Sequence, residues 1–302
     1  MNIGETLRFF RKKLHLTQKE MLDNHLDPSS YSRIEHGKQI IRIDMLAEVL
    51  KKLSLSPEEF FSRVSLDAEQ KKFRELFYYC AEHLDNQTTK QKLIDYYLKL
   101  AKFQHNLKEF SNYIVIKVYF SQFWKEIDSI TDEEVQEIFD YLLKKDYYQQ
   151  YDYLILANTI RFFSTKQQDL VLFRALPIVD ESLRDPLTIN FAYNMLTNLI
   201  SSRIHDKDYD GAKKYLAIAK KQDKAGKNYN FRMTLQYLNN LLEYLVTGEH
   251  QYMEYIYDFI KLLENIGDIQ QADTLKKEVT YLTHSNFASI GKNDFPNGLF
   301  KC

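Results

Sequence analysis

A five-residue pattern, Leu-x-Asn-x-(Ile or Leu), recurs along the second half of the chain and limits its possible folds more than any other feature. It occurs as LANTI, LTNLI and LNNLL, which begin at Leu156, Leu196 and Leu238, about 40 residues apart. Each copy lies in a stretch with apolar residues at helical spacing. After two of them a second amphipathic stretch follows, DYDGAKKYLAIAKK and HQYMEYIYDFIKLL. Repeats of this length are typical of stacked helix pairs, so the pattern predicts a tetratricopeptide-like (TPR-like) α-solenoid.

Composition favours an all-α fold for the rest of the chain as well. The 302 residues include only 8 glycines and 5 prolines, which sheet-rich proteins use in their turns. One stretch, NYIVIKVYF at 112–120, is β-branched enough to be taken for a strand. Because a single strand would have no partner to pair with, we expect this stretch to be a buried helix.

The repeated asparagines are candidates for ligand binding, since equivalent positions on successive first helices line the inner face of a solenoid. A row of amides offers donors and acceptors to the backbone of an extended peptide, whatever its side chains. An arginine one turn after the first asparagine would suit a peptide carboxylate. The alternative is that each asparagine bridges or caps helices internally. The candidate peptide-binding residues are Asn158, Arg161, Asn194, Asn198 and Asn240.

The first 65 residues have the signals of a separate helical bundle, and the first two helices are clear. Leu7, Phe10 and Leu14 lie at helical spacing. Thr17 then opens the tetrapeptide TQKE, a capping box that predicts a second helix over about residues 17–24.

Three more helices complete this predicted five-helix unit. Asp27 is placed to cap the third helix, and Pro28 stands at its first position, where a missing N–H costs nothing. Gly37 is the expected left-handed stop. The fourth and fifth helices are predicted from IDMLAEVLKKL and SPEEFFSRV.

The third helix has a face that suits the major groove of DNA. Tyr31 and Ile34 are three residues apart and should face the core, which turns short polar side chains and one arginine outward. Basic residues just past the helix, and a glutamine at the start of the second helix, could meet phosphates. A helical interaction module without a DNA role is the alternative. The candidate DNA-binding residues are Gln18, Ser29, Ser32, Arg33, His36, Lys38 and Arg42.

This segment resembles the helix-turn-helix heads of the phage-repressor class (Cro/C1 or XRE). The resemblance is carried by LRFFRKKLHLTQKE and YSRIEHGK. It implies that Arg11 and Glu35 form a salt bridge between the first and third helices. The chain departs from the class in the turn DNHLDPSS, which is one residue shorter than usual, and at Leu22, where a small alanine is typical.

With its solenoid, the whole chain is similar to the RNPP regulators, in their Rgg and PrgX branch. The head motif and the last repeats, from YDGAKKYL to DIQQADTLKKEV, carry this second resemblance. It implies a homodimer, intercellular peptide sensing and control of transcription. Some members link their two heads through a cysteine in the fourth helix. Here RIDMLAEVL has none, so we expect no disulfide between heads.

We expect four segments along the chain. They are a DNA-binding head at 1–65, a linker at 66–72, a helical repeat domain for peptide binding and dimerisation at 73–284, and a tail at 285–302. The tail breaks the helical pattern yet is rich in apolar residues. It is expected to cap the last helix pair or to fray, and a mobile arm over the peptide site is the sharper alternative.

Several classes of function lack their sequence signals. The chain has no phosphate-binding loop, no GxSxG or HExxH motif, and only two cysteines, without CxxC spacing, so neither an enzyme nor a cofactor or metal site is predicted. The N-terminus lacks the apolar run of a signal peptide, and no stretch approaches the roughly 18 apolar residues of a membrane span. We therefore expect a cytoplasmic protein that does not contact the membrane.

The sequence as a whole predicts a DNA-binding transcription regulator controlled by a short signalling peptide on the concave face of its repeats. It would bind a near-palindromic operator as a homodimer. Two alternatives stay open. In one, the helical domain binds a protein partner or only dimerises. In the other, the chain is a helical scaffold that does not bind DNA.

Overall fold

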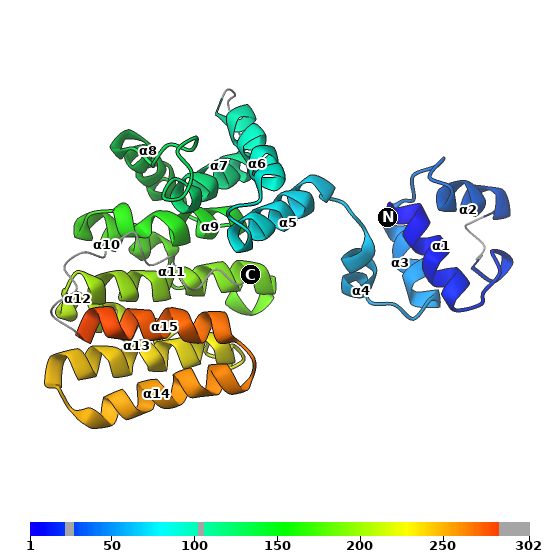
Figure 1. Cartoon of the computed structure of the whole chain (residues 1–302). Coiled ribbons are helices and arrows are strands. Elements are labelled where there is room, and N and C mark those ends of the chain that lie inside the picture. Colours follow the sequence, from blue (N-terminus) through cyan, green and yellow to red (C-terminus); the bar gives the residue numbers. More distant parts are fainter. Residues whose placement is uncertain (22–26, 102–105, 284–302) are drawn as a thin grey trace. The chain divides into compact units, whose positions relative to one another are not determined.

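The computed structural model describes residues 1–21, 27–101 and 106–283 (Figure 1). Every regular element in these ranges is a helix, so the predicted all-α fold is confirmed. The chain divides into two compact units, residues 1–89 and 90–302, which are described separately. None of the helices in the described ranges has the length and apolar character needed to cross a membrane.

Unit 1 contains the predicted head. Its helices are α1 (Ile3–Lys13), the 3-10 turn η1 (Lys19–Met21), α2 (Pro28–Glu35), α3 (Ile43–Lys52), α4 (Pro57–Arg63) and α5 (Ala68–Glu82). The second predicted helix is therefore seen only as η1. The residues that would continue it, Leu22 and the first half of the short turn DNHLDPSS, lie outside the described ranges. Asp27 and Ser56 cap α2 and α4 as N-caps.

Helix α1 packs very closely against α2, and a glycine permits this approach. A Cβ placed on Gly4 would lie 1.9 Å from the carbonyl oxygen of Ile34. The first helix is fixed at its start by Asn2, whose side chain accepts from the backbone N–H of Glu5 in a capping box. Leu7 and the other core residues of α1 then face α2, where Ile34 is buried.

Unit 2 is a series of helices that pack in neighbouring pairs. They are α6 (Gln87–Leu100), α7 (Leu107–Phe120), α8 (Asp132–Leu143), α9 (Gln150–Thr159) with the 3-10 turn η2 (Ile160–Phe162), α10 (Thr165–Ala175), η3 (Glu181–Leu183), α11 (Pro186–His205), α12 (Tyr209–Ala219), α13 (Tyr229–Thr247), α14 (His250–Asn265) and α15 (Ile269–Thr283). The β-branched stretch falls in α7, a buried helix as predicted.

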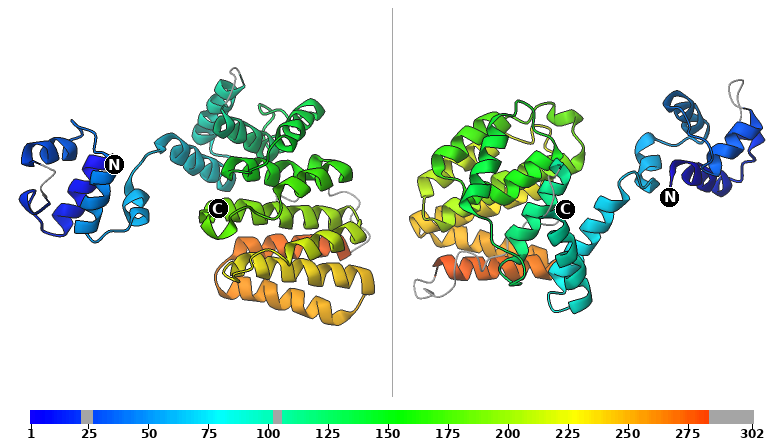
Figure 2. Two further views of the ribbon diagram at one scale, coloured as in Figure 1. Left: turned by 180° about the vertical axis from the view of Figure 1, so that it is seen from behind. Right: turned by 90° about the horizontal axis from the view of Figure 1, so that it is seen from above.

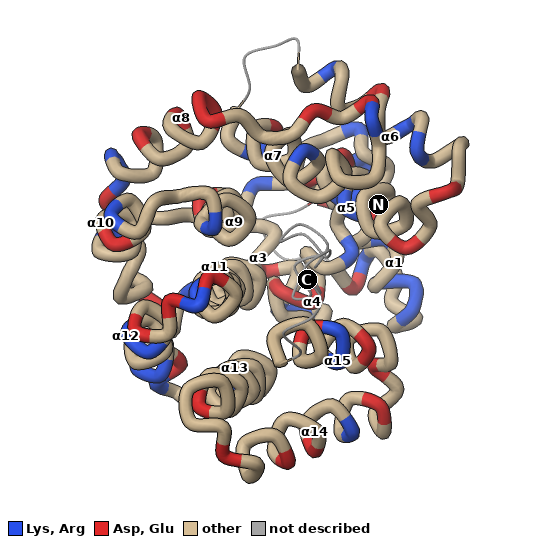
Figure 3. Tube along the Cα trace, turned by 60° about the vertical axis from the view of Figure 1, so that its left-hand side comes forward, with Lys and Arg blue, Asp and Glu red and all other residues tan. Residues whose placement is uncertain are grey.

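The helices of unit 2 form two layers. Figure 3 shows α9, α11, α13 and α15 on the inner side of an arc and α8, α10, α12 and α14 on its outer side. The long helices lie side by side in the further views as well (Figure 2). The layers pack through small residues, because Ala212 and Ala219 on α12 are fully buried where it meets α11 and α13. The predicted TPR-like solenoid is confirmed.

The predicted segment boundaries do not coincide with the boundary between the two compact units. Helix α5 begins at Ala68, inside the segment predicted as a linker, and unit 1 extends to Thr89. The predicted tail, 285–302, lies outside the described residues.

Candidate functional site

Helix α2 has the local structure that its sequence predicts. Asp27 accepts hydrogen bonds from the backbone N–H groups of Ser29 and Ser30. The two serine hydroxyls also donate to Asp27, both at 2.6 Å, and these bonds lower the pKa of its carboxyl group. The chain leaves the helix through Gly37, whose φ is +68°. The helix is therefore fixed at both ends by residues that hold its first turn and its exit.

The outward face of α2 is polar and accessible. Tyr31 and Ile34 are buried, whereas Ser29, Arg33 and His36 are exposed and Ser32 is half-buried. The Arg33 guanidinium donates to the Gln39 side chain at 3.1 Å and to the Ser30 hydroxyl at 3.2 Å. His36 bonds to the carbonyl of Ser32 through Nδ1. Because these hydrogen bonds are exposed to solvent, Arg33 and His36 can replace them with hydrogen bonds to base edges. The face therefore suits readout of the major groove.

A buried ion pair joins α1 to α2. Nε and Nη2 of Arg11 donate to the two carboxylate oxygens of Glu35 at 2.5 and 2.8 Å. Glu35 is 1% exposed, and its second oxygen also accepts from the Gln18 amide at 2.8 Å. Burial raises the pKa of Glu35, but the hydrogen bonds from Arg11 and Gln18 outweigh it and leave the pKa lowered. The salt bridge implied by the repressor resemblance is confirmed.

This arrangement also shows where the remaining DNA candidates lie. The side-chain amide of Gln18 donates to the Glu35 carboxylate, so in this structure Gln18 stabilises the packing of the head. Lys38 is exposed just past α2. Arg42 is exposed at the start of α3, where it pairs with Asp44 at 2.9 Å. Their contacts with phosphate stay a prediction.

In unit 2, the predicted asparagines lie on α9, α11 and α13, and they are more buried than a free ladder of amides would be. Asn158 is 2% exposed and donates to the Leu154 carbonyl in its own helix. Asn198 is 9% exposed and donates to the Ala157 carbonyl, which links α11 to α9. Both side-chain amides already donate to backbone carbonyls. A role in peptide binding therefore requires that these hydrogen bonds break, or that the amide oxygens accept hydrogen bonds from the peptide.

The other two asparagines differ in exposure. Asn240 is buried on α13, and its oxygen accepts from the Gln236 amide at 3.0 Å. Asn194 is half-buried on α11, one turn before Asn198. Asn194 is therefore the member of the row that offers most surface on the inner layer.

Arg161, in η2, is a half-buried cation whose guanidinium is partly desolvated. Its Nε is buried and has no hydrogen-bond partner. Its guanidinium carbon lies 4.8 Å from the centre of the Phe162 ring, and burial lowers its pKa. In the described part of the chain no carboxylate pairs with it. A desolvated guanidinium without a paired carboxylate is costly, so this position favours an anionic group other than those of the described residues.

A second polar cluster was not predicted from the sequence. The carboxylate of Glu278 on α15 accepts from the Ser201 hydroxyl at 3.1 Å, from His205 Nε2 at 2.9 Å and from the Tyr237 hydroxyl at 2.8 Å. The cluster joins α11, α13 and α15. The three bonds to Glu278 span 41 to 77 residues of the chain, and no motif or period connects their members. Within the described ranges, no three His, Cys, Asp or Glu side chains gather closely enough to hold a metal ion.

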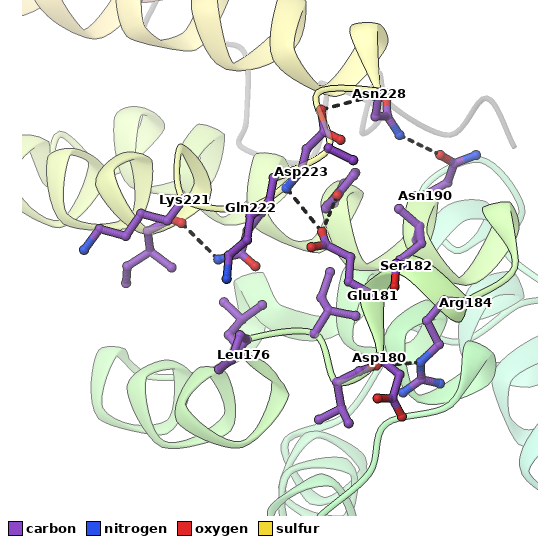
Figure 4. Close-up of a pocket in the computed structure, with 18 of the residues that line it drawn as sticks. Leu176, Asp180, Glu181, Ser182, Arg184, Asn190, Lys221, Gln222, Asp223 and Asn228 are labelled. Atoms are coloured by element: carbon purple, nitrogen blue, oxygen red, sulfur yellow. Dashed lines mark hydrogen bonds between the residues drawn. The ribbon is translucent and has the colours of Figure 1, made fainter.

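A groove of about 1700 Å³ lies between α10, α12, the loops that follow them and the first half of α11 (Figure 4). Its walls include Leu172 and Phe173 of α10 and Ile218 of α12. Figure 4 shows Glu181 accepting from the backbone N–H of Asp223, which ties the two loops together. None of the predicted peptide-binding residues lines this groove.

Comparison with known families identifies both units. The family model described as "HTH-type transcriptional regulator Rgg, C-terminal domain" matches residues 90–277, and a helix-turn-helix model matches residues 7–60. The chain belongs to the Rgg family of helix-turn-helix transcriptional regulators. The two matches place the DNA-reading module of this Rgg regulator in unit 1 and the Rgg-specific module in unit 2. None of the curated proteins matches the chain.

Solved structures share the fold over most of the chain. The SHP pheromone receptor Rgg2 of Streptococcus dysgalactiae is 20% identical, with a TM-score of 0.68 over 93% of this chain and 99% of that one. The PrgX/cCF10 complex is 18% identical, with a TM-score of 0.73 and the same coverage. A regulator from Listeria monocytogenes EGD-e is 20% identical, with a TM-score of 0.71 over 93% of this chain and 96% of that one. At these identities the likeness shows a shared fold and no more.

Proposed function

We propose that this Rgg regulator binds DNA through α2 and is controlled by a short signalling peptide held on the inner layer of unit 2. One similar structure is described as a pheromone receptor and another as a bacterial peptide pheromone/receptor complex, which supports a peptide as the ligand. The observation that carries the proposal is Arg161, a desolvated guanidinium without a carboxylate among the described residues. The C-terminal carboxylate of a peptide would supply the missing charge.

Further parts of the peptide site are proposed from the same layer. Asn194 would bind the peptide backbone through its partly exposed amide. The buried side chains of Asn158, Asn198 and Asn240, between the helices of the inner layer, would hold Asn194 and the peptide in position. The regulator is proposed to act in the cytoplasm as a homodimer that places two α2 helices in successive major grooves of a near-palindromic operator, about 34 Å apart.

The first prediction concerns base recognition by α2. We expect Arg33→Ala to weaken operator binding by about 1–3 kcal/mol and to relax the base preference, because Arg33 is the fork-shaped donor on the exposed face. Titrations of an operator duplex and a random duplex would measure both effects. The control is Lys38→Ala, which should weaken both duplexes alike and reduce the salt slope by about one. Unchanged affinities for Arg33→Ala would show that α2 does not read bases.

The second prediction concerns the peptide carboxylate. Short apolar peptides should bind at least tenfold more tightly as free acids than as carboxamides, a difference of about 1.4 kcal/mol. Arg161→Gln should remove this preference, because it removes the unpaired charge. Calorimetry with both peptide forms makes the measurement. Arg184→Gln is the matched control, since Arg184 also has a buried nitrogen without a partner among the described residues but lines the groove between α10 and α12.

The outcome separates the proposal from its alternatives. If no peptide of either form binds while DNA binding persists, unit 2 binds a protein partner or only dimerises. If salt-dependent binding of duplex DNA is also absent, the chain is a helical scaffold. If Arg161→Gln keeps the preference for free acids, the carboxylate is held elsewhere.

A further inference from the structure

The stretch between Asp210 and Glu243, which runs from α12 into α13, is strongly basic. It contains seven lysine or arginine residues and a single acidic residue, Asp223. The whole chain has 41 basic and 42 acidic residues, so this excess of positive charge is local. Figure 3 shows the basic residues of α12 in blue on the outer side of the arc. The proposed DNA and peptide sites use none of the seven, which are Lys213, Lys214, Lys220, Lys221, Lys224, Lys227 and Arg232.

Three of these lysines line the groove between α10 and α12 and have no counter-charge. Lys221, Lys224 and Lys227 are exposed and follow one another at intervals of three residues. None of them has an ion-pair partner among the described residues. Lys214 also lines the groove, but Asp169 of α10 pairs with it at 2.7 Å. The α12 side of the groove therefore presents a row of three available cations.

Most acidic groups of the groove are engaged within the chain. Glu181 accepts from the Tyr193 hydroxyl and from the backbone N–H of Asp223. Asp223 in turn accepts from two backbone N–H groups of its own loop, at 3.0 and 3.1 Å (Figure 4). Asp180 lies on the loop after α10, away from the α12 side in the chain. These carboxylates hold the loops in place, and the lysines remain for an anionic ligand.

Apolar side chains form another part of the groove. Phe173 of α10 is 83% exposed, and Val179 on the loop after α10 is 44% exposed. Tyr229, the first residue of α13, also lines the groove and is 72% exposed. The groove thus combines an exposed apolar surface with a row of cations. That combination suits a ligand that has both anionic and apolar groups.

The size of the groove indicates a segment of polypeptide and not a small molecule. Its volume is about 1700 Å³, whereas small-molecule sites usually have about 300–1,000 Å³. A single-stranded nucleic acid is also an extended anion, but it binds on successive aromatic platforms. Two aromatic lining residues, Tyr193 and Tyr215, are buried, which leaves only Phe173 and Tyr229 of the lining to stack on bases. The rest of the apolar lining is mainly aliphatic, and this favours apolar side chains of a protein.

We propose that the groove between α10 and α12 binds an acidic segment of another protein, with carboxylates on Lys221, Lys224 and Lys227 and an apolar side chain against Phe173. This site is separate from the proposed peptide site, because neither Arg161 nor the four asparagines line the groove. The partner protein would therefore bind the repeat domain without competing with the signalling peptide.

A designed peptide tests the groove on the full chain. The probe alternates glutamate or aspartate with leucine and phenylalanine, and its binding is followed by fluorescence anisotropy at low salt. Two matched peptides replace every acidic residue by lysine, or every apolar residue by serine. We expect each of them to bind at least about tenfold more weakly than the probe, because each lacks one of the two properties that the groove recognises.

Variants of the groove locate the binding. Lys221→Glu with Lys227→Glu should weaken the probe at least about tenfold, because attraction becomes repulsion. Phe173→Ser should weaken it by about tenfold, since less apolar area is then buried. Lys261→Glu with Lys277→Glu, on α14 and α15, is the matched control. It changes the net charge equally at exposed positions outside the groove and should leave the affinity unchanged. All of these side chains are exposed, so each variant should keep the helical signal of the wild type.

Several results would overturn the inference. The probe could fail to bind, or the groove variants could behave like the control. Loss of binding in Arg161→Gln would place the probe in the inner layer. Competition by an oligothymidine strand that depends on the same lysines would assign the groove to nucleic acid. A changed oligomeric state of Lys221→Glu with Lys227→Glu in sedimentation would make the groove a contact between copies. Binding of DNA through α2 and of signalling peptides is measured separately, so the proposed function stands or fails independently.

Discussion

Arg11→Ala is expected to unfold most of unit 1 while unit 2 stays folded. The substitution leaves Glu35, which is 1% exposed, as a buried carboxylate without its cation. Breaking a buried pair from one side typically costs about 3–5 kcal/mol. At roughly 0.05–0.15 kcal/mol per residue, a head of about 65 residues has only about 3–10 kcal/mol in total. DNA binding should be lost with the head, because Glu35 ends the helix that is proposed to read bases.

The single tryptophan makes this prediction easy to measure. Trp124 is buried in unit 2, so its fluorescence reports the repeat domain alone, whereas far-UV circular dichroism reports helices of both units. Arg11→Ala should lower the helical signal and leave the fluorescence transition in denaturant unchanged. Arg42→Ala is the matched control. Arg42 pairs with Asp44 at the exposed surface, so its removal should not alter either signal. If Arg11→Ala gave the same helical signal as the wild type, the ion pair would not be needed to keep the head folded.

Acid should act on the same pair in a defined direction. Because the pKa of Glu35 is lowered in the folded head, the ion pair contributes its full stability above the ordinary glutamate value of 4.5. The contribution is lost as the pH falls through the lowered folded pKa. The difference between the wild type and Arg11→Ala should therefore be constant above pH 4.5 and shrink below it.

Local rules account for what the sequence could predict in the head. Asp27, Pro28 and Gly37 each act within one turn of α2, so their roles follow from neighbours in the chain. The identity of the core residues follows from helical spacing in the same way. The contact of Gln18 with Glu35 could not be foreseen, because it depends on how η1 approaches α2 across a 17-residue separation.

In the repeat domain, period predicts which helix a residue lies on but not what its side chain touches. The recurrence of Leu-x-Asn identified α9, α11 and α13 as equivalent helices. The register between neighbouring helices then decides that Asn198 reaches the Ala157 carbonyl, 41 residues away. The outer layer shows the same limit, since Phe173 has helical spacing like any core residue but is 83% exposed.

Glu278→Ala is expected to release α15 from the inner layer. The Glu278 side chain is 12% exposed and accepts from three side chains on α11 and α13. Its removal leaves the Tyr237 hydroxyl without an acceptor in a residue that is 2% exposed, and His205 and Ser201 lose the same partner. The loss of several hydrogen bonds to one buried charge should cost about 3–5 kcal/mol.

Hydrogen exchange would locate this effect, since the backbone amides of α15 should lose protection in Glu278→Ala while those of α8 and α10 keep theirs. The matched control is Glu264→Ala, which removes a pair with Lys276 that also fastens α15 but is largely exposed, and should leave protection unchanged. Because its bonds lower the pKa of Glu278 despite burial, the difference from the wild type should be full above pH 4.5 and fade as the pH falls further. Equal protection of α15 in both variants would mean that apolar packing, through Ala272 and Val279, holds the helix without the cluster.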